Sequence, residues 1–163
     1  MEHGGGPAWA LAPEKSGLGR TPRESIWLYP GVNLAHVLAM AMLLGAIWVF
    51  DLRVLGLGRG IDVRRLTRLA LPVAGGGLAV AAPSGLLLFV SEASAYIVNP
   101  VFLAKLAFIA AGLINAASAH FGPYRRIEHW TVAAPPLAAR ISAMVSLALW
   151  FAAASAGRLI AYY

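Results

Sequence analysis

The sequence predicts an all-α fold, an integral membrane four-helix bundle. Its 163 residues are 60% hydrophobic and only 12% charged, whereas soluble domains carry about twice that charged fraction. The apolar residues form four blocks, each long enough to cross a hydrocarbon layer of about 30 Å as a helix. We therefore expect the lipid bilayer to surround one domain over 26–163. Its expected spans are about 26–52, 69–91, 101–121 and 141–161.

Residues 1–25 precede the first apolar block and are rich in glycine, with nearly balanced charges. They lack the basic segment and short apolar core that together mark a signal peptide. We expect them to form an external arm, flexible or loosely docked, before an uncleaved first span. The chain has no cysteine, which excludes a disulfide framework and a thiolate metal site.

The first block contains the most unusual polar residues. No formal charge occurs from Ile26 to Phe50, but Asn33 and His36 interrupt the apolar run. A period of 3.6 residues places both near one stripe with Asp51, so we expect this stripe to face protein. A protonatable side chain is costly to insert into a membrane, which makes His36 the first candidate for a functional role.

The later blocks add small residues and a few charges. Prolines and glycines in the second block predict a kinked, closely packed helix, or room for a flat cofactor. The third block carries Lys105 near its start and His120 near its end, and Arg158 follows the fourth. We expect 124–140 to be a polar loop.

The distribution of basic residues predicts the orientation. The segments after the first and third spans are mostly basic, with Arg53, Arg59, Arg64, Arg65, Arg68, Arg125, Arg126 and Arg140 against Asp51, Asp62 and Glu128. The opposite side is nearly balanced. Because basic loops stay in the cytoplasm, we expect both termini to be external. The net charge of +6 then fits a membrane-facing role, and we expect no nucleic-acid partner.

This orientation places Asn33, His36, Lys105 and Arg158 in the outer half of the membrane and His120 at the inner end. A neutral imidazole on a membrane helix is a suitable axial ligand for haem b, and the two basic side chains suit its propionates. His120 lies roughly ten residues deeper than His36, or about 15 Å along the axis. One iron cannot bind both, so it would be five-coordinate or take an unusual sixth ligand. His120 is a weaker metal-site candidate, with Met144.

Other interpretations use the same residues. His36 is equally consistent with a buried imidazole satisfied by a hydroxyl, an amide or a carbonyl, and the two basic residues with side chains that extend to the head groups. Transport of a soft copper ion or a proton through His36 is a second alternative. A third is a cofactor-free anchoring subunit of a larger membrane assembly. No nucleophile–base motif or phosphate loop is present, which argues against catalysis of the kind found in soluble enzymes. Other enzymatic activity stays open.

Four segments carry a resemblance to a known family. WLYPGVNLAHVLAMAMLLG, DLRVLGL, NPVFLAKLAFIAAGLIN and SLALWFAAASAGRLIAY resemble a family of uncharacterised four-helix bacterial inner-membrane proteins, over Trp27 to Tyr163. More distantly, the chain is similar to the copper-resistance protein D superfamily, which includes a haem-b protoporphyrinogen oxidase. There, a first-helix His and a third-helix Lys are functional, which implies roles for His36 and Lys105. The DLRVLGL and GRLIAY segments depart from the oxidase pattern, so the resemblance implies haem-associated electron transfer in a complex rather than porphyrinogen oxidation.

Overall fold

A computed structural model describes residues 8–17, 19, 25–131 and 135–162, and this part of the chain is helical with no strand. The all-α prediction is therefore confirmed. The long helices are α3 (Leu28–Leu55), α4 (Val63–Ser91), α6 (Pro100–Phe121) and α7 (Leu137–Leu159). The short ones are α1 (Ala8–Lys15), α5 (Ala93–Tyr96) and the 3-10 helices η1 (Pro123–Thr131) and η2 (Ile160–Tyr162).

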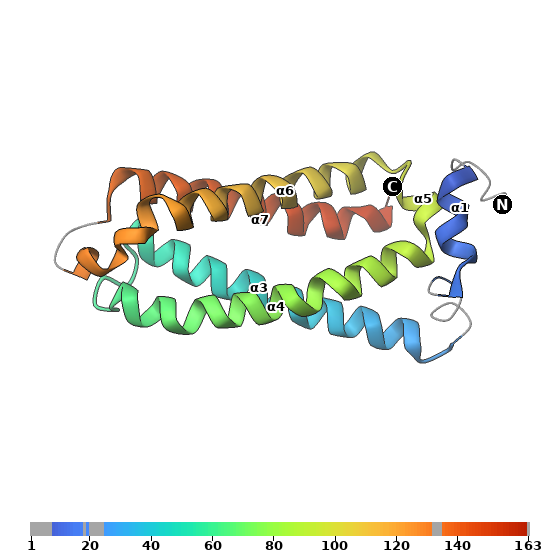
Figure 1. Ribbon diagram of the computed structural model, residues 1–163, viewed down its shortest axis with the longest axis horizontal. Helices are drawn as coiled ribbons and strands as arrows, with labels where there is room; N and C mark the ends of the chain where they lie inside the picture. The colour runs from blue at the N-terminus through green and yellow to red at the C-terminus, as the bar shows by residue number, and fades with distance from the viewer. Residues whose placement is uncertain (1–7, 18, 20–24, 132–134, 163) are drawn as a thin grey trace.

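The long helices form an elongated up-and-down bundle (Figure 1). Helix α3 packs along α4, α6 packs along α7, and the two pairs meet mainly through α3 and α7. One end, which we call the loop end, carries the α3–α4 connection and η1. The other, the tail end, carries α1, α5 and the end of α7.

Each long helix is long and apolar enough to cross a membrane, and these are the four such helices in the described residues. Large apolar side chains point outward along the bundle, among them Leu34, Leu86, Ile114 and Phe151, each at least 60% exposed. Such a surface is not found on soluble proteins of this size but suits contact with lipid. The chain is a multi-pass membrane protein.

Local sequence explains where the spans begin and end. Helix α3 ends at Gly56, whose φ of 113° is a left-handed conformation that glycine adopts without strain. Helix α4 begins after Asp62, whose carboxylate accepts a hydrogen bond from the backbone N–H of Arg65 at 3.1 Å. Asn99 caps α6 in the same way, through Val101. Helix α4 begins at Val63, about two turns before Leu69, where the uncharged block begins.

Two segments outside the spans are more ordered than the sequence predicts. Where 1–25 predicts a flexible or loosely docked arm, Ala8–Lys15 forms α1, and Glu14 accepts hydrogen bonds from the N–H and hydroxyl of Ser94, both at 2.7 Å. The expected polar loop after α6 contains η1. Its Trp130 is only 8% exposed because it joins the apolar core of the loop end with Phe50 and Val54.

Small residues set the approach of the helices. A Cβ at Gly77 of α4 would lie 2.7 Å from the carbonyl oxygen of Ala39 on α3, and one at Gly112 of α6 would lie 3.2 Å from the Trp150 ring on α7. Both positions are therefore filled by the neighbouring helix. The sequence left open whether these glycines serve packing or give room to a cofactor, and at these two positions they serve packing.

Candidate functional site

His36 lies at the contact between α3 and α4, toward the tail end. Its Nδ1 is 3.0 Å from the carbonyl oxygen of Ala81 and 3.0 Å from the hydroxyl oxygen of Ser84. The Cε1 atom would be 2.9 Å from a Cβ at Gly85, so the ring rests directly on the α4 backbone. The half-buried imidazole is thus bonded to a carbonyl and a hydroxyl. The sequence analysis gave this arrangement as one interpretation of His36.

The hydrogen bonds of His36 define its tautomer. A carbonyl oxygen only accepts, so the proton of the neutral ring is on Nδ1. The Ser84 hydroxyl donates to the carbonyl oxygen of Val80 at 2.6 Å, which leaves a lone pair to face that proton. Nε2 of a neutral His36 then carries a lone pair. A histidine oriented through one nitrogen and free at the other is the usual arrangement of a metal ligand.

Lys105 lies on the first turns of α6, and its charge acts on His36. Its ammonium group is close enough to interact electrostatically with the imidazole. A Cβ at Gly157 of α7 would lie 3.5 Å from both Cε and Nζ of Lys105, so this side chain extends along α7. The first-span histidine and the third-span lysine are therefore within electrostatic range of each other, although they are far apart in sequence.

The other two residues predicted for this site are less involved. Asn33 is exposed on α3, one turn before His36. Arg158 is exposed at the end of α7, where it donates a hydrogen bond to the Tyr162 hydroxyl at 3.1 Å and lies 5.3 Å from the centre of that ring. Arg158 directly follows Gly157, which Lys105 approaches, but its guanidinium group contacts Tyr162 of η2.

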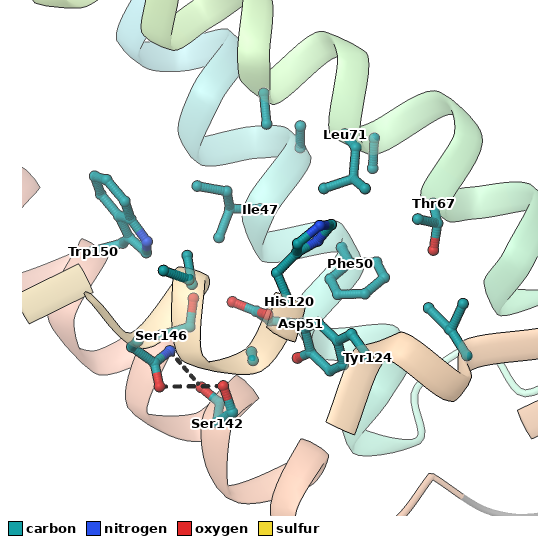
Figure 2. A pocket seen from close by; sticks show the side chains of 18 of the residues that line it. Ile47, Phe50, Asp51, Thr67, Leu71, His120, Tyr124, Ser142, Ser146 and Trp150 are labelled. Carbon is teal, nitrogen blue, oxygen red and sulfur yellow. Dashed lines mark hydrogen bonds between the residues drawn. The ribbon is translucent and has the colours of Figure 1, made fainter. Parts of the chain in front are cut away.

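His120 belongs to a different place, a cavity of about 440 Å³ near the loop end. The cavity is lined by residues of α3, α4, α6, η1 and α7, and Figure 2 shows His120, Asp51 and Tyr124 turned toward its interior. Met144, which the sequence paired with His120, is exposed and does not line it. Within the described residues no group of three or more His, Cys, Asp or Glu side chains is placed to hold a metal ion.

Asp51 was not predicted as a site residue, but it lies buried on the wall of this cavity. It is 3% exposed and faces the cavity. Ser146 lines the same cavity, and the Oδ2 atom of Asp51 is buried without a hydrogen-bond partner. In the sequence, Asp51 stands beside Arg53 at the end of an apolar block and resembles an ordinary interfacial charge. Its place on the His36 stripe was the signal that it points inward.

The polar wall of this cavity is ordered by hydrogen bonds between α6 and α7. Asn115 donates to the carbonyl oxygen of Ser142 at 3.0 Å, and the Ser142 hydroxyl donates back to the Asn115 side chain at 3.1 Å (Figure 2). Burial, and then the nearby Asp51 carboxylate, raise the pKa of the Tyr124 phenol in η1. The phenol therefore stays protonated and neutral at physiological pH.

Comparisons of this chain with protein-family models, with curated proteins and with solved structures found no match.

Proposed function

We propose that this chain is a bacterial inner-membrane protein that binds haem b through His36 and takes part in electron transfer as a subunit of a larger membrane complex. In this proposal both termini are periplasmic, so the tail end with His36 and Lys105 is the outer half. Haem b would supply a one-electron couple of iron within the membrane. A cofactor-free anchoring subunit is the competing proposal.

The observation that carries the proposal is the anchoring of His36 through Nδ1. The Ala81 carbonyl and the Ser84 hydroxyl hold the ring in one orientation and one tautomer, and hydrogen bonding of this kind raises the basicity of the opposite nitrogen. A merely structural histidine needs no free Nε2. Nδ1 of His36 is thus bonded to α4, whereas Nε2 keeps a lone pair for a ligand.

Lys105 adds the second part of the site. An ammonium group within electrostatic range of His36 matches the carboxylates of a haem, because a cation near the outer surface pairs with propionate groups. The Lys105 side chain extends along α7 as far as Gly157, so its charge stays next to a neighbouring helix. Arg158, already bonded to Tyr162, is a secondary partner at most.

The test is a reduced-minus-oxidised difference spectrum of protein purified from cells with an ample haem supply. We expect a b-type band in the wild type, its loss in His36→Ala, and its retention in His120→Ala, which changes the same residue type at the loop end. Colourless wild-type protein would overturn the haem proposal in favour of the anchoring subunit. Metal analysis of the same sample by mass spectrometry tests for bound copper.

A further inference from the structure

The loop-end cavity is separate from the site of His36. Its volume of about 440 Å³ falls within the range of pockets that hold small organic molecules. It lies near the end of α3 opposite to His36, since Asp51 follows His36 by fifteen residues, or about 22 Å of helix. The haem proposal uses none of the residues that line it.

The chemistry of this cavity is a single acidic group in an apolar chamber. Phe50, Leu71, Ile47 and Trp150 contribute apolar walls, and Oδ2 of Asp51 has no hydrogen-bond partner. A buried carboxylate oxygen without a donor is costly, because it has lost its water and gained nothing in exchange. The Oδ2 atom can therefore accept a hydrogen bond from a positively charged donor.

No cation of the protein supplies that donor among the described residues that contact Asp51. The nearest basic residue in sequence, Arg53, is engaged elsewhere, since its guanidinium donates to the carbonyl oxygens of Ile61 at 2.6 Å and Arg59 at 3.3 Å. The other titratable groups on the cavity wall are His120 on α6 and the neutral Tyr124 on η1. The remaining polar lining residues, on α4, α6 and α7, are hydroxyl and amide side chains.

These features restrict the ligand. An anion would be repelled by the carboxylate, and a bare divalent ion lacks a cluster of acidic or imidazole ligands in the described residues. A protonated amine donates a charge-assisted hydrogen bond to a carboxylate. Aromatic walls such as those of Phe50 and Trp150 accommodate both an apolar body and an adjacent cation.

We propose that the loop-end cavity binds a lipophilic amine in its protonated form, with the ammonium group donating to Asp51 Oδ2 and the apolar body lying against Phe50, Leu71 and Trp150. Because the ammonium group needs an N–H, a quaternary ammonium of similar size binds more weakly than a primary amine.

The experiment uses the whole protein in lipid nanodiscs and 4-(4-fluorophenyl)butylamine as the probe, observed by fluorine NMR with empty nanodiscs as the blank. We expect saturable binding to the wild type. Asp51→Asn preserves the shape of the side chain but removes its charge, and should weaken binding by about tenfold or more, the worth of a charge-assisted hydrogen bond. The corresponding alcohol, 4-(4-fluorophenyl)butanol, should bind the wild type more weakly by a similar factor.

Two further variants make the outcome decisive. Asp62→Asn is the same chemical change in an exposed residue at the same end of the molecule and should leave amine binding unchanged. Leu71→Trp fills the cavity from its α4 wall without altering the carboxylate and should abolish binding. The proposal is overturned if the wild type shows no saturable binding beyond that of lipid, or if either Asp51→Asn or Leu71→Trp binds the amine as the wild type does.

Discussion

The protonation of single side chains decides what the tail-end site can bind, and His36 is the residue on which this depends. Its Nδ1 faces a carbonyl oxygen at 3.0 Å, and this distance requires a proton on Nδ1 in the neutral ring. The tautomer follows because the Ala81 carbonyl oxygen can only accept a hydrogen bond. It does not depend on whether any cofactor is bound, so it can be measured on the protein alone.

We predict that nitrogen NMR of histidine-labelled, cofactor-free protein at mildly alkaline pH will show a pyrrole-type Nδ1 and a pyridine-type Nε2 for His36. Ser84→Ala should leave this pattern unchanged, because the Ala81 carbonyl remains as the acceptor. His36→Ala identifies the signals. A pyridine-type Nδ1 in the wild type would contradict the hydrogen bond to Ala81 and remove the main support for a ligand at Nε2.

At the scale of the helices, stability rests on how closely α3 and α4 approach. Neighbouring apolar helices gain little from the hydrophobic effect inside a membrane, so packing of small residues supplies much of the association. Gly77 lies at such a contact, since a Cβ there would be 2.7 Å from Ala39 O and 2.8 Å from Leu43 N, both backbone atoms that cannot move aside easily. The adjacent Gly76 has nothing within 4 Å of the same position.

These two glycines form a matched pair for a stability test. We predict that Gly77→Ala lowers the free energy of unfolding by about 1–3 kcal/mol through overpacking, whereas Gly76→Ala leaves it unchanged or raises it by up to about 1 kcal/mol through helix propensity. Unfolding in detergent micelles by titration with a denaturing detergent, followed by circular dichroism, measures both. Equal effects of the two substitutions would show that α3 and α4 do not meet at Gly77.

The helices also show how far sequence reasoning extends. Hydropathy located four spans to within a few residues at most boundaries, because membrane crossing depends on length and composition, which are local. The helix η1 was not predicted, since it depends on packing against the loop-end core around Phe50 and Trp130. Likewise, the hydrogen bond between Glu14 and Ser94 joins residues 80 positions apart and leaves no periodic signal.

The candidate site could be predicted in part for a similar reason. The cost of polar groups in an apolar block identified His36 and Lys105, and in the structure the Lys105 charge acts on the His36 imidazole. The same reasoning assigned Asn33 to the site of His36, but Asn33 is exposed. Whether a stripe residue is covered depends on where the neighbouring helix crosses, and Asp51 is buried because η1 and α7 close the loop end around it.

For the molecule as a whole, the open question is which way it spans the membrane. Both connections rich in arginine lie at the loop end, while α1, α5 and the end of α7 lie at the tail end (Figure 1). Basic segments next to short loops are retained on the cytoplasmic side. The loop-end amine site would then open toward the cytoplasm, and His36 with Lys105 would lie toward the periplasm.

The absence of cysteine from the sequence allows this orientation to be tested with single cysteines. Gly60 in the α3–α4 connection has open space around it, and Val98 between α5 and α6 is 55% exposed; neither position is a helix cap. We predict that a membrane-impermeant maleimide added to intact spheroplasts labels Val98→Cys, and labels Gly60→Cys only after the membrane is permeabilised. The reverse labelling pattern would mean that the protein has the opposite orientation in the membrane. It would move the proposed haem site to the cytoplasmic half and open the amine site to the periplasm, because the two sites lie toward opposite ends of one bundle.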